Sequence, residues 1–373
     1  MNLKIGIITL SSSNNCGSCL QSYALKKILE QYGDVEVINF SSVKSHRLYD
    51  IFSMRAFRSG IKHPTQLLHR FANFKNLMRE KKAYEDFRSN YINIHGREFF
   101  AEDLHEIASK YDVIVAGSDQ VWNVCMYDFD EAFFVPWANC KKVAYAPSLG
   151  GYDIRESKNY GKIKEYIADF SMLSAREEWG KKCLEEITGR PVKKVLDPTL
   201  MLPLEEYQKM IGEPIISGDY IFFYSWAYCY EELLNIVAKE SQKSNLPVYV
   251  IDSRKWININ PGKYGFHLSS NEGPLAFLNL MYYAKRCYVE SFHGMLFAYM
   301  FKKDFWLLDT SKSFNELDTR LKELVLLIDA KERILTDYNK NEIDQSIPVR
   351  YEPNPLLEKM RKESSIYLSE AFK

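Results

Sequence analysis

The sequence lacks the features that commit a chain to a membrane, to secretion or to a polyanionic partner. Its 49 lysines and arginines equal its 49 aspartates and glutamates, so no net charge attracts nucleic acid. No apolar run approaches the roughly 20 residues of a membrane span, and residues 1–10 lack the long apolar stretch of a secretory signal. The 7 cysteines, an odd number, are typical of reduced thiols. We therefore expect a globular cytoplasmic protein with no nucleic-acid partner.

Several common catalytic motifs are also missing. The chain has no His/Cys spacing typical of zinc sites, no phosphate loop ending in Gly-Lys-Ser/Thr and no clear nucleophile triad. Asp128 and Asp130 form an acidic pair, but two carboxylates are too few ligands to infer a metal. We therefore expect neither a metal nor a cofactor.

Strand and helix patterns alternate along most of the chain. The 373 residues, 46% of them hydrophobic, are enough for two cores. Short apolar runs are typical of strands that are buried on both faces of a parallel sheet. They predict a first series of strands at 3–10, 35–40, 113–116, 142–146, 171–175 and 192–196, and a second series at 220–224, 247–251, 287–289 and 305–308.

This alternation predicts an α/β fold with two Rossmann-like domains. Residues 212–218 carry glycine and proline and are the predicted linker. The first domain then covers 1–212 and the second 213–350, and an amphipathic helix over 351–373 packs back across both. A helical insertion at about 44–100, rich in lysine and arginine, interrupts the first domain. Its apolar face would cover the sheet, or it would touch anionic lipid at the inner membrane surface.

A run of polar side chains follows the predicted strand 113–116. It consists of Ser118, Asp119, Gln120 and Asn123. In open α/β sheets ligands collect outside the carboxyl ends of the strands, so these residues are candidates for substrate binding. The alternative is an ordinary polar turn in which Trp122 anchors the core.

The loop after the first strand is a second candidate region. Its candidate binding residues are Asn14, Asn15, Gly17 and Gln21. The free backbone amides at the helix start there can receive a phosphate or a carboxylate. The same loop carries Cys16 and Cys19 at a thioredoxin-like spacing, for which the alternative is a pair of small packing residues.

Two charged or titratable residues follow other predicted strands. Arg176 comes after strand 171–175, where a guanidinium can grip a planar carboxylate or phosphate; the alternative is a salt bridge to Glu177 or Glu178. His293 lies in the turn between strand 287–289 and an apolar helix at 295–301. An imidazole there can act as a general acid or base at neutral pH, although a lone histidine is more often structural.

Taken in order, these segments resemble the polysaccharide pyruvyl transferase family. The matching motifs lie within residues 4–326 and are Ile5–Leu10, Ser13–Leu25, Gly117–Asn123, Tyr145–Ser148, Ser174–Glu177, Leu196–Leu200 and Ser291–Gly294. The chain departs from the family pattern in two places. Cys16 and Cys19 stand where relatives more often have an aromatic and a small apolar residue, and Ser291 stands where some branches have an arginine.

The resemblance implies a fold similar to the two-domain GT-B glycosyltransferases, with the active site in the interdomain cleft. The implied reaction moves pyruvate from phosphoenolpyruvate onto two hydroxyls of a sugar and yields a cyclic ketal and phosphate. The acceptor would be a sugar or a lipid-linked oligosaccharide in capsule or exopolysaccharide synthesis. At the matching motifs, the family's functional residues correspond to His293 and Arg176.

The chemistry of this donor suggests roles for the candidate residues. Phosphoenolpyruvate is nearly a trianion, and its enol carbon becomes electrophilic only as the neighbouring methylene is protonated. We expect His293 to deliver that proton or to assist phosphate departure, and Arg176 with Lys302 or Lys303 to neutralise the anion. Ser291 is a further candidate contact. Two alternatives stay open, namely a glycosyltransferase of the same fold that uses a nucleotide sugar and a non-catalytic glycan-binding protein.

Overall fold

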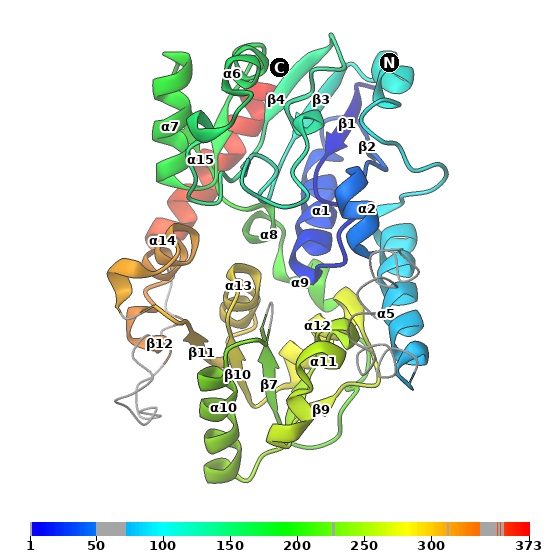
Figure 1. Cartoon of the computed structure of the whole chain (residues 1–373). Coiled ribbons are helices and arrows are strands. Elements are labelled where there is room, and N and C mark those ends of the chain that lie inside the picture. The colour runs from blue at the N-terminus through cyan, green and yellow to red at the C-terminus, as the bar shows by residue number, and fades with distance from the viewer. Residues whose placement is uncertain are drawn as a thin grey trace. The chain divides into compact units, whose positions relative to one another are not determined.

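The computed structural model describes residues 2–49, 72–225, 228–311, 313–335, 349, 351 and 354–373. The chain divides into two units. Figure 1 shows the chain, coloured by residue number from blue at the N-terminus to red at the C-terminus. Unit 1 comprises residues 1–50, 86–202 and 355–373, and unit 2 comprises residues 51–85 and 203–354.

The division between the units falls at Leu202 and Pro203, not in the predicted linker at 212–218. Pro203 separates two short helices, α8 (Pro198–Met201) and α9 (Leu204–Gln208). Tyr207 of α9 packs edge-on against Phe297, with 5.0 Å between the ring centroids, which explains why this segment belongs to unit 2. Residues 72–85 of the predicted insertion are also part of unit 2 rather than of the N-terminal domain.

Unit 1 contains a parallel sheet with the strand order β2-β1-β3-β4. Its strands are β1 (Lys4–Ile8), β2 (Asp34–Val37), β3 (Val113–Ala116) and β4 (Lys141–Ala144). All four residues of β3 are buried, as its apolar run predicts. A separate parallel pair consists of β5 (Ser174–Ala175) and β6 (Lys193–Lys194). The helices are α1 (Cys16–Leu29), α2 (Val43–Tyr49), α6 (Tyr160–Ala168), α7 (Glu178–Thr188), α8 and α15 (Pro355–Ala371).

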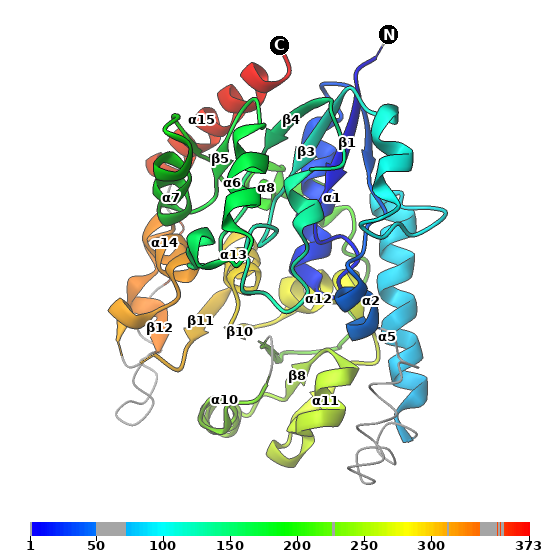
Figure 2. The ribbon, with the colours of Figure 1, turned by 45° about the horizontal axis from the view of Figure 1, so that its top comes forward.

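The core of unit 1 includes Trp122, in agreement with the alternative in which this residue anchors the core below a polar turn. Its ring stacks on Phe134 at 5.2 Å and meets Phe170 edge-on at 5.3 Å. The C-terminal helix α15 packs on the same unit, and Figures 1 and 2 show it beside α7. Tyr367 donates a hydrogen bond to the carbonyl of Ala144 at 2.8 Å, so α15 is held at the end of β4.

Unit 2 contains a six-stranded parallel sheet with the order β12-β11-β10-β7-β8-β9. Its strands are β7 (Ile221–Tyr224), β8 (Val248–Val250), β9 (His267–Leu268), β10 (Arg286–Val289), β11 (Asp304–Leu308) and β12 (Ile334–Leu335). The helices, besides α9, are α5 (Phe74–Phe87, of which 74–85 belong to unit 2), α10 (Glu231–Ser244), α11 (Ser253–Ile259), α12 (Gly273–Tyr283), α13 (Phe292–Met300) and α14 (Thr319–Leu327).

Residues 72–85 of the predicted insertion dock on unit 2, whereas residues 44–49 and 86–100 belong to unit 1. Glu80 of α5 accepts a hydrogen bond from the Arg254 Nε at 2.8 Å, and a Cβ added to Gly273 would lie 2.9 Å from the Ala83 side chain. This close approach requires a glycine at the start of α12. Residues 50–71, which carry part of the predicted lipid contact, lie outside the described residues. Among the described helices, none has the length and apolar character needed to cross a bilayer.

Candidate functional site

The carboxyl end of β3 in unit 1 carries the first group of candidate residues. Gly117 has a φ of +122°, and a Cβ there would lie 2.1 Å from the carbonyl oxygen of Tyr145. Only glycine fits this turn. Ser118 is fully buried, and its hydroxyl donates to the carbonyl of Ala146 at 3.0 Å. Asp119 accepts a hydrogen bond from the Ser18 hydroxyl of α1 at 2.7 Å. The chain therefore brings the loops after β1 and β3 together, as predicted from the βαβ order.

Arg176 lies in a buried group of carboxylates on the same rim. Its Nη1 is 2.9 Å from Asp197 Oδ2 and 3.8 Å from Asp119 Oδ1, and its Nε is 2.6 Å from Glu177 Oε1. The side chain is only 4% exposed. Burial lowers the pKa of Arg176, but the three carboxylates outweigh it and raise that pKa above its ordinary value. The salt bridge from Arg176 to Glu177, which the sequence offers as the alternative to anion binding, is thus present. With three carboxylates and one guanidinium, the group as a whole carries negative charge.

The remaining candidates after β3 form contacts within unit 1. Asn123 donates to Gln120 Oε1 at 2.9 Å, and Asn123 is 4% exposed. Gly150 packs against this amide pair, since a Cβ added to it would lie 2.2 Å from Asn123 Nδ2. These two amides therefore stabilise the loop that follows β3.

The loop before α1 is organised by its own side chains. Asn15 caps α1 and accepts from the Ser18 backbone N–H at 3.2 Å. Asn14 accepts from Arg88 Nη1 at 3.1 Å, and Gly17 is buried in the first turn. Gln21 is fully buried and donates to Thr9 Oγ1 at 2.8 Å. Its amide nitrogen is thus committed inside unit 1, which is a correction to its predicted role as a substrate contact.

The two cysteines of this loop are buried free thiols. Burial raises the pKa of Cys19 to about 11, whereas redox-active cysteines have a lowered pKa. The structure therefore agrees with Cys16 and Cys19 as small packing residues and not with a thioredoxin-like pair.

His293 in unit 2 lies in the first turn of α13. The helix begins at Phe292, three residues earlier than the apolar pattern indicates, because Ser291 caps it by accepting from the Gly294 N–H at 3.0 Å. Ser291 thus contributes to the site through this cap. Gly294 allows the close approach, since a Cβ there would lie 2.8 Å from Ser291 Oγ. His293 is 8% exposed, and its ring meets Phe292 edge-on at 5.1 Å.

Glu290 directly follows β10, before α13 begins, and is not among the candidates predicted from the sequence. Its carboxylate accepts a hydrogen bond from the Ser225 hydroxyl, which follows β7. Burial raises the pKa of Glu290 to about 7, and Asp309 adds to the effect. A carboxyl group that holds its proton near neutral pH is typical of a catalytic acid or base. An acidic residue directly after a predicted strand was the available signal, but burial cannot be read from the motif.

Lys302 and Lys303 do not join His293. They follow α13, whose 9 residues rise about 13 Å from the end that carries His293. Lys303 donates to the carbonyl of Tyr282 at 2.8 Å, and burial lowers its pKa. The prediction that these lysines neutralise the donor beside His293 is therefore corrected.

No group of three or more His, Cys, Asp or Glu side chains in the described part of the chain is arranged to hold a metal ion. The chemical groups described after the strands are carboxylates, amides, the Arg176 guanidinium and the His293 imidazole.

A family model described as polysaccharide pyruvyl transferase matches residues 15–312. The chain belongs to the polysaccharide pyruvyl transferase family. Membership makes this pyruvyl transferase an enzyme that acts on a polysaccharide or sugar acceptor. A sequence comparison with curated proteins finds no match.

Solved structures show which fold this pyruvyl transferase has. UDP-GlcNAc 2-epimerase from Methanocaldococcus jannaschii is 12% identical, with a TM-score of 0.52 over 98% of this chain and 100% of that one. The enzyme from Neisseria meningitidis is 11% identical, with a TM-score of 0.53 over 99% and 100%. The enzyme from Rickettsia bellii is 11% identical, with a TM-score of 0.52 over 100% and 97%. These similarities confirm an α/β fold of the GT-B type with parallel sheets.

Proposed function

We propose that this enzyme transfers pyruvate from phosphoenolpyruvate to two hydroxyls of a sugar, forming a cyclic ketal and releasing phosphate. The acceptor is a polysaccharide or a lipid-linked precursor made at the cytoplasmic face of the membrane, and the donor is the only small molecule the reaction needs. The observation that carries the proposal, beyond the family, is the group formed by Glu290, His293 and the start of α13.

The proton chemistry of the reaction suits this group. A proton added to the methylene carbon converts it to a methyl group and leaves the neighbouring carbon electrophilic. Two sugar oxygens bond to that carbon, phosphate leaves with the bridging oxygen, and the two hydroxyl protons pass to a base and to the departing phosphate. His293 delivers the first proton, and Glu290, with its pKa of about 7, accepts or returns a proton nearby.

The charge of the donor is matched at the same helix end. The first backbone N–H groups of α13 lack partners within the helix, and the helix dipole places partial positive charge there. Ser291 caps this end by accepting from the N–H of Gly294, so the positive end of the α13 dipole is held in place where it would favour an anion. This arrangement replaces the role expected of Lys302 and Lys303.

The negative rim of unit 1 suits the acceptor better than the donor. Asp119, Glu177 and Asp197 outnumber the single positive charge of Arg176, so a trianion would be repelled there. Carboxylates accept hydrogen bonds from sugar hydroxyls. We assign Arg176 a positioning role, since it holds these carboxylates in place.

His293→Ala tests the proposal. The variant should release phosphate from phosphoenolpyruvate at least about 100-fold more slowly, because general acid catalysis typically contributes that much. His267→Ala, an exposed histidine of the same unit, is the matched control and should keep normal turnover. Turnover of His293→Ala within a few-fold of the unmodified enzyme would refute the role of His293.

A donor titration separates this function from the alternatives. The proposed enzyme binds phosphoenolpyruvate in calorimetric titration, whereas a glycosyltransferase binds a nucleotide sugar. A glycan-binding protein without activity binds saccharides and releases no phosphate. Binding of a nucleotide sugar without binding of phosphoenolpyruvate would overturn the assignment.

A further inference from the structure

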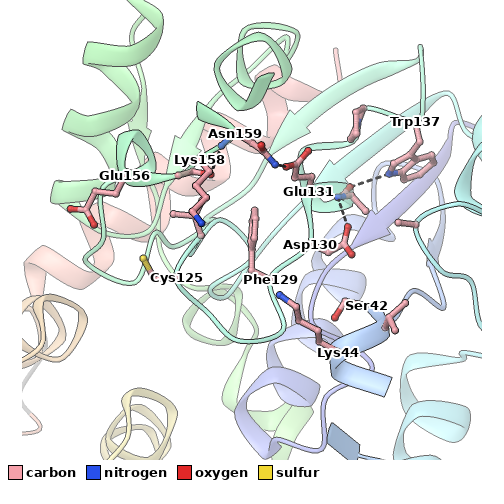
Figure 3. Close-up of a pocket in the computed structure, with 16 residues that line it drawn as sticks. Ser42, Lys44, Cys125, Phe129, Asp130, Glu131, Trp137, Glu156, Lys158 and Asn159 are labelled. Atoms are coloured by element: carbon pink, nitrogen blue, oxygen red, sulfur yellow. Dashed lines mark hydrogen bonds between the residues drawn. The ribbon is translucent and has the colours of Figure 1, made fainter. Parts of the chain in front are cut away.

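Unit 1 carries a pocket that none of these roles uses. Its volume is about 840 Å³, within the roughly 300–1,000 Å³ typical of small-molecule sites. Its wall comes mainly from the start of α2, the loop 124–137 and the turn 156–159, all of unit 1 (Figure 3).

Two aromatic rings give the pocket apolar surfaces. The Trp137 indole N–H donates to the carbonyl of Ala132 at 3.0 Å, which fixes the orientation of the ring. The Phe129 ring packs edge-on against Phe134 at 6.0 Å. Both Trp137 and Phe129 are half-buried in the pocket wall, so part of each ring faces the space. Aromatic faces of this kind pack well on the C–H faces of sugar rings.

Polar groups surround these rings. Asp130 accepts from the Ala132 backbone N–H at 2.9 Å, which caps the short helix that follows. Glu131 accepts a hydrogen bond from the Asn159 amide, so two segments of the wall are joined (Figure 3). Carboxylate and amide groups held in this way can bind several hydroxyls through their remaining donors and acceptors.

The charges of the pocket argue against an anionic ligand. Figure 3 shows the amino groups of Lys44 and Lys158 on two sides of Phe129. Three carboxylates, including those of Asp130 and Glu131, accompany these two amino groups in the wall. The sum is slightly negative, so a trianion such as the donor gains nothing here. An uncharged polyol meets donors, acceptors and apolar faces together.

We propose that this pocket binds an uncharged sugar residue of the acceptor saccharide, next to the sugar residue that receives the ketal. The inference rests on the proposed function and specifies where its acceptor is held. The loop after β3 supports it, because that loop carries Asp119 on the rim and lines the pocket from Val124 onward. Asn123 joins the two parts by accepting from the Cys125 N–H at 3.1 Å.

Saccharide titration of the full chain tests the pocket directly. The probes are neutral oligosaccharides of glucose, galactose and N-acetylglucosamine of increasing length, measured by calorimetry. Affinity should rise with length, and Phe129→Ala should weaken the binding of the longer probes roughly three- to tenfold. Asn159→Ala changes an exposed side chain, so the variant should keep the fold. It should bind the longer probes about two- to tenfold more weakly.

The control is Tyr152→Ala, which removes a 49% exposed aromatic outside the pocket wall and should bind like the unmodified chain. Phosphate release from phosphoenolpyruvate, measured separately, reports on the proposed function alone. Unchanged saccharide binding in both pocket variants, or no binding by any probe, would overturn the inference even if phosphate release is normal.

Discussion

Glu272→Gln is expected to flatten the pH dependence of the stability of unit 2. Glu272 is 5% exposed and accepts hydrogen bonds from the Asp252 N–H at 2.9 Å and the Ser253 hydroxyl at 2.5 Å. Glu80 of α5, which is 2% exposed, lies near it. Burial raises the pKa of Glu272 to about 8, and the charge of Glu80 adds to the effect. Arg254 pairs with Glu80 and partly offsets the repulsion.

The raised pKa determines the sign of the effect. In the unfolded chain a glutamate titrates near about pH 4.3. The folded state therefore holds a proton that the unfolded state has lost, from about pH 4.3 up to the folded value of about 8. Stability is fully present below this window and falls as the pH rises through it. Each rise of one pH unit lowers the free energy of unfolding by at most about 1.4 kcal/mol. The loss caused by Glu272 between about pH 5 and about pH 8 is therefore at most about 4 kcal/mol.

The glutamine variant resembles the protonated acid in shape and hydrogen bonding. Urea unfolding followed by circular dichroism at about pH 5 and about pH 8 should show similar stability at the lower pH. At the higher pH the variant should be more stable by at least about 1 kcal/mol. Glu232→Gln, an exposed glutamate of α10, is the control and should follow the unmodified chain. Parallel pH profiles for Glu272→Gln and the unmodified chain would refute the reasoning.

Three further outcomes follow from the contacts in unit 1. Arg176→Met leaves the buried Asp197 without its ion pair, and denaturant unfolding should show a loss of about 3–5 kcal/mol; a loss below about 1 would contradict the network. Gly150→Ala places a side chain at a φ of +66° and should lower the free energy of unfolding by about 1–3 kcal/mol. Gly161→Ala, whose added Cβ meets open space, is the control and should not lower it. Equal stabilities of the two variants would contradict the close packing at Gly150. The Cys19 thiol, with its pKa of about 11, should resist alkylation at neutral pH until the chain unfolds; rapid native labelling would show otherwise.

The fold follows well from local patterns where strands are continuous and buried. The prediction for β3 at 113–116 matches the structure because an apolar run of this kind needs a covered position on both faces. β9 and β12 were not predicted because each has only 2 residues and neither lies in a longer apolar run, whereas the equally short β5 and β6 lie within the predicted strands 171–175 and 192–196. The unit boundary was misplaced because Pro203 lacks the glycine-rich surroundings of 212–218, and the packing of Tyr207 decides it.

The candidate site was harder to predict, because residue type does not reveal a partner. Gln21 and Asn123 have the amides expected of sugar contacts, yet their hydrogen bonds hold unit 1 together. Arg176 has the charge expected of a donor clamp, but three carboxylates surround it. Glu290 escaped because its significance comes from burial, which raises its pKa to about 7.

The most direct test of the account is mass spectrometry of the enzyme incubated with phosphoenolpyruvate and a panel of lipid-linked saccharides. The account predicts that one acceptor gains the mass of a pyruvate ketal while an equal amount of phosphate is released, and that His293→Ala gives neither product. A panel without any pyruvylated acceptor, together with transfer of a sugar from a nucleotide donor, would contradict it.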